Sequence, residues 1–162
     1  MSITADRLRA VLRYEKESGQ FYWIAPPWNH TNLIGQRAGC NATGYILIRI
    51  DGRKYKAHRL AWLYVKGVWP KSRLDHRDGQ TTNNRIDNLR EATPAQNCAN
   101  SRRRSGKVIA KGVRRLPSGK FQARIRHENK LQTIGTFQTE DQAAQAYFAR
   151  ARAFYGEFAR AA

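Results

Sequence analysis

A few polar positions in the middle of the chain carry side chains that could together hydrolyse a phosphodiester bond. Asp75 and His76 are adjacent, and Asn97 follows further along the chain. A histidine of near-neutral pKa can deprotonate water, and a hard divalent cation can bind the oxygens of the phosphate and of the leaving group. Asp75 and Asn97 offer an anionic and a neutral oxygen ligand for such a cation. The residue types therefore suit metal-assisted hydrolysis.

These side chains must be positioned by short elements that the sequence also predicts. Leu74-Asp75-His76 is typical of a strand that ends at the polar, turn-forming stretch 78–84, and Asn88-Leu89-Arg90 predicts a second short strand. Thr93-Pro94 predicts a helix start, with Thr as N-cap and Pro in the first turn, and the helix should run through Asn97 to about Arg102. Because side chains alternate along a strand, Asp75 and His76 should point to opposite sides.

The segment from about Lys56 to Asn100 resembles the HNH endonuclease family, in its phage and homing-endonuclease branch. The likeness is carried by Ala57-His58-Arg59-Leu60-Ala61-Trp62, by Asp75-His76 with Asp78-Gly79, by Asn83-Asn84-Arg85-Ile86-Asp87-Asn88-Leu89-Arg90, and by Thr93 with Gln96-Asn97. Asn97 stands where the motif has its final histidine, and an asparagine at this position is common in this branch.

The resemblance implies a role for each matching position. His76 would be the general base, Asp75 and Asn97 would hold one Mg²⁺ or Mn²⁺ ion, and Asn88 would brace the loop and orient the histidine. His58 is a further candidate as a DNA contact, although a helix-start histidine buried beside Trp62 is at least an equal alternative.

The C-terminal part of the chain predicts a sheet covered by one helix. Residues 112–115, 120–127 and 131–137 alternate as strands do. Thr139 and Gln142 have the form of a capping box that opens an alanine-rich helix ending at Gly156. Residues 111–156 resemble the ethylene-response-factor (APETALA-type) DNA-binding domain, through Lys111-Gly112-Val113-Arg114-Arg115, Ser118-Gly119-Lys120-Phe121, Ala123-Arg124-Ile125-Arg126 and Ile134-Gly135-Thr136-Phe137.

In that family the sheet enters the major groove, so the resemblance implies that the sheet face turned away from the helix contacts DNA. The candidates for that face are Lys111, Arg114, Lys120, Arg124 and Arg126, and Arg115 is a further candidate DNA contact. Solvated charges on an exposed sheet are the alternative. Leu116, Ser118 and Thr133 stand where plant members usually carry Arg or Trp, so the GC-rich target of those proteins does not carry over.

Composition agrees with a polyanionic partner. Thirty Lys and Arg face twelve Asp and Glu, which gives a formal net charge of +18 and favours nucleic acid or an acidic membrane surface. No apolar run is long enough to span a bilayer, and the N-terminus lacks the apolar core of a signal peptide. Cys40 and Cys98 are far apart and outside any CxxC motif, so we expect two reduced thiols in a cytoplasmic protein.

Together these observations predict an α+β protein in two modules. A nuclease domain at 1–100 would contain a ββα-metal core at about 72–102, and a basic linker at 101–107 would lead to a sheet-based DNA-binding domain at 108–162. The predicted activity is metal-dependent endonuclease cleavage of double-stranded DNA, of a homing or phage type, with a monomer as the favoured state. The alternatives are a DNA-binding regulator whose HNH module has decayed, and an RNA-binding protein, which is disfavoured because sheets that bind RNA usually display stacking aromatics.

Overall fold

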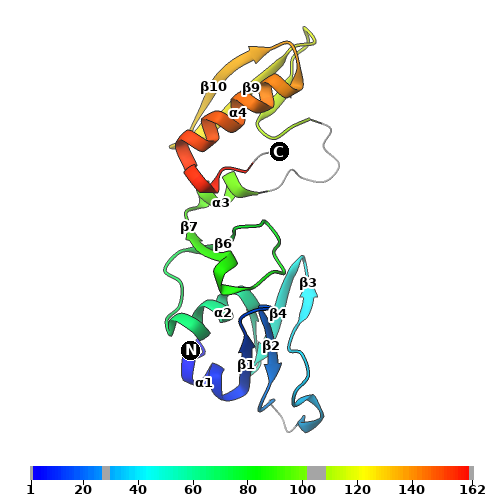
Figure 1. Cartoon of the computed structure of the whole chain (residues 1–162), viewed down its shortest axis with the longest axis vertical. Coiled ribbons are helices and arrows are strands. Elements are labelled where there is room, and N and C mark those ends of the chain that lie inside the picture. Colours follow the sequence, from blue (N-terminus) through cyan, green and yellow to red (C-terminus); the bar gives the residue numbers. More distant parts are fainter. Residues whose placement is uncertain (1, 27–29, 102–108, 161–162) are drawn as a thin grey trace. The chain divides into compact units, whose positions relative to one another are not determined.

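The computed structural model describes residues 2–26, 30–101 and 109–160, and the chain forms two compact units, Met1–Ala92 and Thr93–Ala162 (Figure 1). Both units mix helices with small antiparallel sheets, which confirms the α+β class. The boundary between the units precedes the helix that bears Asn97, whereas we had expected that helix in the nuclease domain. Most of the predicted linker at 101–107, and Trp28, lie outside the described residues.

The first unit is built around one apolar core. Its elements are α1 (Ala5–Val11), the hairpin of β1 (Leu12–Glu15) and β2 (Gln20–Trp23), the sheet of β3 (Cys40–Ala42), β4 (Tyr45–Ile50) and β5 (Arg53–Lys56), and α2 (Ala57–Lys66). A short 3₁₀ helix, η2, spans Thr31–Leu33. The core consists of large side chains from α1, both sheets and α2, chiefly Leu8, Leu12, Phe21, Ile48, Ile50, Leu60 and Leu63.

The β4–β5 hairpin turns at Asp51-Gly52. Both residues have positive φ, 48° and 78°, which is the backbone that a two-residue type I′ turn requires and that Asp-Gly favours. The chain then passes from β5 directly into α2 at Ala57. The second residue of α2 is His58, so the hairpin fixes where this histidine enters the core.

A second two-stranded sheet completes the first unit. It pairs β6 (Arg73–His76) with β7 (Leu89–Ala92) in antiparallel register, and the 3₁₀ helix η3 (Ile86–Asn88) leads into β7. The strand that we expected at residues 88–90 therefore begins one residue later. All of β6 after Arg73 is buried.

The second unit begins with α3 (Pro94–Asn100) and continues with a three-stranded sheet and a long helix. The sheet has the order β10 (Lys130–Phe137), β9 (Phe121–His127), β8 (Val113–Arg115), and it is followed by α4 (Glu140–Tyr155) and the 3₁₀ helix η4 (Gly156–Phe158). Helix α4 lies across β9 and β10 (Figure 1).

Helix α4 begins as the sequence predicts, because Thr139 and Gln142 form the full capping box. Small side chains of α4, Ala143 and Ala151, are buried, as are Ala123 and Ile125 of β9. In the described parts of the chain, no helix is long and apolar enough to cross a membrane.

Candidate active site

Asp75 and His76 occupy the last two positions of β6 and point to opposite sides of the strand. The register pairs Asp75 with Arg90 and His76 with Leu89 on β7. Residues that lie directly opposite in an antiparallel pair share a face. Asp75 and Arg90 therefore occupy one face and His76 the other, as the alternation of the sequence predicts.

Asp75 forms a buried ion pair with Arg90. The Arg90 Nε donates to Asp75 Oδ2 at 2.9 Å, and the two side chains are only 4% and 8% exposed. A buried carboxylate needs such a partner, because desolvation of an unpaired charge costs several kcal/mol. Sequence reasoning did not single out Arg90. Its place directly across the ladder from Asp75 is the signal that could have identified it.

His76 lies in a buried pocket of aromatic and amide groups. Its Nε2 lies 3.5 Å from Asn84 Oδ1, and its ring meets the His58 ring edge-on at a centroid distance of 5.0 Å. Burial lowers the pKa of His76, and the Asn84 contact with the charges of Asp78 and Asp75 offsets part of that effect. A histidine with a lowered pKa is neutral at pH 7 and can accept a proton.

Asn84 is itself fixed by the hairpin of β1 and β2. The Tyr14 hydroxyl donates to the Asn84 carbonyl at 2.8 Å, and Asn84 is only 3% exposed. Gly19 has a φ of 69°, and a Cβ at this position would lie 2.4 Å from the backbone nitrogen of Arg85. The close approach therefore requires glycine, and the first hairpin thereby places the residue that contacts His76.

The loop after His76 is closed by Asn88. The Asn88 side chain accepts from the Asp78 N–H at 3.0 Å and donates to Asp78 Oδ1 at 3.0 Å and to the Asn83 carbonyl at 2.9 Å. Asn83 donates in turn to Asp78 Oδ2 at 2.6 Å. Burial alone would raise the pKa of Asp78, but hydrogen bonds from Gln80, Asn83 and Asn88 outweigh it and lower the pKa. These contacts match a bracing position for Asn88.

His58 lies beside His76 and is 6% exposed. Burial, with smaller contributions from His76, Lys56 and Arg59, lowers the pKa of His58 to about 3. Its Nδ1 is enclosed and has no hydrogen-bond partner among the residues that the structure describes. Tyr45 packs against both histidine rings, at 5.4 and 6.3 Å. The burial of His58 agrees with the alternative of a buried helix-start histidine, and the DNA contact of His58 stays a prediction.

Asn97 lies on α3, within the second unit. The structure thus brings together Asp75, His76, Asn88 and His58 in the first unit. The pairing of Asn97 with Asp75 stays a prediction.

The basic candidates of the second unit lie in four places. Register places Arg114 opposite Gln122, and Arg114 Nε donates to Gln122 Oε1 at 3.0 Å. Alternation along β9 puts Arg124 and Arg126 on this same face, opposite the buried Ala123 and Ile125. Gln122 belongs to this outer face too, and alternation alone could have identified it.

The other candidates lie elsewhere. Arg115 pairs with Phe121 and so shares the α4 side of the sheet, and its contact with DNA stays a prediction. Lys120 is exposed in the turn before β9. Lys111 donates to backbone carbonyls at the end of α3. Cys40 and Cys98 are both free and exposed.

Comparison with known proteins supports a nuclease domain in this chain. Residues 55–99, which include Asp75, His76, Asn88 and Asn97, match the family model of the HNH endonucleases. An uncharacterized HNH endonuclease of Acanthamoeba polyphaga mimivirus is 36% identical over 114 residues, covering 69% of this chain and 59% of the relative. Residues 55–99 are therefore similar to the HNH endonucleases, and this similarity supports a nuclease domain there.

A second relative is of another kind. An ethylene-responsive transcription factor of Arabidopsis thaliana is 43% identical over 72 residues, covering 43% of this chain and 21% of the relative. The chain thus spans less than two thirds of the length of either relative. No solved structure matches the chain.

Proposed function

We propose that the protein is an endonuclease that hydrolyses phosphodiester bonds of double-stranded DNA, with His76 as general base. The observation that carries the proposal is the neutral, buried His76 adjacent to Asp75, followed by a loop that Asn88 closes. The HNH family match over 55–99 supports the same reaction class.

The chain's own groups divide the work in this mechanism. His76 accepts a proton from the attacking water, which its lowered pKa permits at pH 7. Asn84 and the Asn88-braced loop orient the histidine, and Arg90 fixes the direction of the Asp75 carboxylate. His76, which accepts the proton, and Asp75, which would bind the cation, lie on opposite sides of β6. The general base and the metal ligand therefore do not compete for the same cation.

The donor chemistry fits a single hard divalent cation. The Asp75 carboxylate and the Asn97 amide oxygen are the ligand types that Mg²⁺ and Mn²⁺ take, and Mg²⁺ usually keeps water and substrate phosphate as further ligands. Among the described residues, no group of three His, Cys, Asp or Glu forms a metal cage, which is consistent with a site that substrate completes. A cation bound there would neutralise charge on the phosphate.

The outer face of the β8–β10 sheet is the proposed DNA-binding surface. Arg114, Arg124 and Arg126 share it, and Lys120 lies exposed at its edge. With a net charge of +18, binding should weaken steeply with salt, because each phosphate contact releases counterions. A homing or phage-type enzyme, in which this sheet selects the site and the HNH domain cuts, is the specific form of the proposal.

The decisive test incubates supercoiled plasmid and a pool of long duplexes with the protein and Mg²⁺ or Mn²⁺. The wild type should nick or linearise DNA only with metal, and His76→Ala should lose about 10²–10⁴-fold in rate, as expected for loss of a general base. Both proteins should retard DNA equally in gel shifts without metal. Equal cleavage by the two proteins would refute the role of His76.

One observation favours the alternative of a DNA-binding regulator with a decayed nuclease. Arg90 already neutralises Asp75, one of the two proposed metal ligands. Under this alternative the wild type binds duplex DNA tightly but cleaves none of the pool with either metal. Competition between duplex DNA and structured RNA in the same gel shifts tests the RNA-binding alternative.

A further inference from the structure

Helix α3, which bears the proposed metal ligand Asn97, is too short to be stable by itself. It spans seven residues, whereas isolated helices of fewer than about twelve residues are marginal in water. Its N-terminus is satisfied locally by the capping box of Thr93 and Gln96. Its C-terminus must find partners for the last carbonyl groups.

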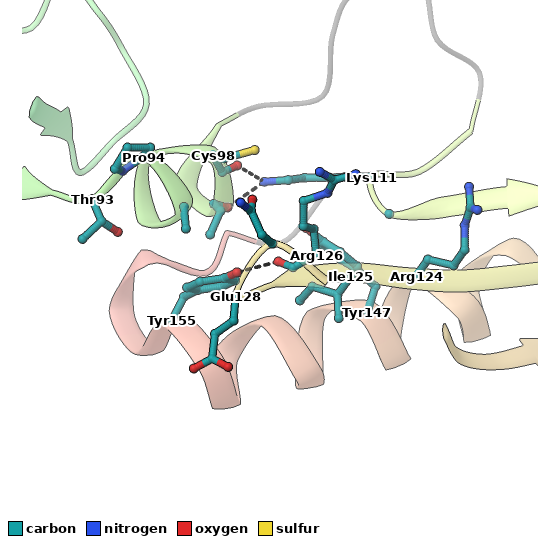
Figure 2. A pocket seen from close by; sticks show the side chains of 14 residues that line it. Thr93, Pro94, Cys98, Lys111, Arg124, Ile125, Arg126, Glu128, Tyr147 and Tyr155 are labelled. Atoms are coloured by element: carbon teal, nitrogen blue, oxygen red, sulfur yellow. Dashed lines mark hydrogen bonds between the residues drawn. The ribbon is translucent and has the colours of Figure 1, made fainter. Parts of the chain in front are cut away.

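Lys111 is one source of these partners, and the Ser101 N–H and hydroxyl also donate to the Cys98 carbonyl, at 3.2 and 2.7 Å. The Lys111 ammonium donates to the carbonyls of Cys98, Ala99 and Ser101 at 2.8, 2.6 and 3.0 Å. Figure 2 shows Lys111 reaching the end of α3 at Cys98. An ammonium has three N–H donors, and all three are matched by carbonyls here. The positive charge also lies at the negative end of the helix dipole, where it is favourable. Lys111 cannot donate to a DNA phosphate from this position without releasing α3.

The backbone next to Lys111 is fixed by a glycine. Gly112 has a φ of 73°, and a Cβ there would lie 2.0 Å from the Tyr147 ring of α4. Only glycine allows this approach. Lys111 is therefore carried on a segment that packs tightly on α4 immediately before β8.

The polar contacts matter because α3 lacks a continuous apolar interface with β9. A pocket of about 590 Å³ lies between them, lined by Pro94 and Cys98 of α3 and by Ile125, Tyr147 and Tyr155 (Figure 2). Lys111 lines this pocket, and its pKa is lowered by burial. At the end of α3, the Arg160 N–H adds a long hydrogen bond to the Ala99 carbonyl, at 3.4 Å.

We propose that Lys111 is a positioning residue of the nuclease, which ties the helix that bears Asn97 to the DNA-binding sheet. The inference rests on the proposed function, in which Asn97 is a metal ligand. Because Lys111 joins the end of α3 to the segment that leads into β8, the sheet proposed to dock on DNA also sets the orientation of Asn97. Loss of Lys111 should therefore lower the affinity for the metal ion and leave the affinity for DNA unchanged.

The test compares Lys111→Met with Lys16→Met, which removes the same charge from an exposed turn. Three quantities are measured: DNA affinity against salt in Ca²⁺, the Mn²⁺ concentration for half-maximal cleavage, and Mn²⁺ binding to the protein–DNA complex by electron paramagnetic resonance. For Lys111→Met we expect the Mn²⁺ affinity to fall, and the Mn²⁺ concentration for half-maximal cleavage to rise, by about tenfold or more. Loss of groups that orient metal ligands has effects of this size. DNA affinity and its salt slope should equal those of Lys16→Met, which also shows that the second unit is folded.

A second variant separates positioning from charge. Lys111→Arg keeps the charge but replaces the three-donor ammonium by a planar fork, so the Mn²⁺ requirement should still rise while the salt slope stays that of the wild type. A lower salt slope for Lys111→Met, by about 0.9 relative to Lys16→Met, with unchanged Mn²⁺ binding would show that Lys111 contacts phosphate and would overturn the inference. Unchanged Mn²⁺ binding in both variants overturns it as well.

Failure of the proposed function gives a different result. If the wild type cleaves no DNA but its DNA complex binds Mn²⁺, the proposed nuclease activity is refuted. Weaker Mn²⁺ binding by the DNA complex of Lys111→Met would in that case still support positioning by Lys111. A wild type that cleaves while Lys111→Met keeps the same Mn²⁺ requirement refutes only the role of Lys111.

Discussion

Replacing His58 by Phe should make the first unit less sensitive to acid. The His58 ring is buried and its pKa is about 3 in the folded protein, whereas an unperturbed histidine has a pKa of about 6.5. Below pH 6.5 the unfolded chain binds a proton at this position and the folded protein does not. Stability from the neutral ring is therefore complete above about pH 6.5 and is lost as the pH falls toward 3.

The magnitude follows from proton linkage. Each pH unit between the two pKa values changes the free energy of unfolding by about 1.4 kcal/mol. Between pH 7 and pH 5 the wild type should lose about 2 kcal/mol through His58 alone. This figure depends mainly on the unfolded pKa, because at pH 5 the folded ring is still neutral.

Urea unfolding followed by tryptophan fluorescence measures the effect. All four tryptophans precede residue 93, so the signal reports on the first unit. Phe keeps an aromatic ring and removes the enclosed Nδ1 that has no hydrogen-bond partner, so His58→Phe should be at least as stable as the wild type at pH 7. The variant should lose about 2 kcal/mol less than the wild type on going to pH 5.

The exposed His30 provides the control. His30→Gln should lose as much stability as the wild type at pH 5, because it leaves the buried His58 in place. Equal losses for the wild type and His58→Phe would refute the assignment of His58 as a buried, neutral ring.

Two further predictions concern the charged groups of each unit. Arg90→Met should destabilise the first unit by about 3–5 kcal/mol, because it leaves Asp75 buried without its partner. The double variant Arg90→Met with Asp75→Asn should recover part of that loss in the same unfolding assay, and a loss equal to the sum of the two single variants would show that the ion pair contributes no coupling. Arg126→Ala should lower the salt slope of DNA binding by about 0.9 if its guanidinium contacts a phosphate. Arg150→Ala, on α4, is the control and should leave the slope unchanged in the same titrations. An equal drop for both variants would refute the sheet face as the DNA-binding surface.

Much of the local structure follows from neighbouring residues. The Asp51-Gly52 turn and the Thr139 capping box each depend on a few adjacent side chains and backbone angles, so the pattern of the sequence suffices to predict them. Alternation likewise predicted that Asp75 and His76 point apart and that Arg124 and Arg126 share a face opposite Ala123. The start of β1 could not be predicted, because Leu12 continues the helical spacing of Leu8 and Val11. Only the pairing of β1 with β2 shows where the helix ends.

The sequence by itself also determined the residue types of the candidate site and the basic surface, since Asp75, His76, Asn88 and Asn97 stand in a recognisable order on a highly charged chain. Their partners were decided only by the tertiary structure. The pairing of Arg90 with Asp75, the burial of His58 against His76, and the attachment of Lys111 to the end of α3 join groups whose contacts no local spacing encodes. Such contacts depend on which elements pack together and in what register. For that reason the sequence indicates the reaction class and its candidate residues. The residues that neutralise Asp75, pack against His76 and hold α3 are identified only by the tertiary structure.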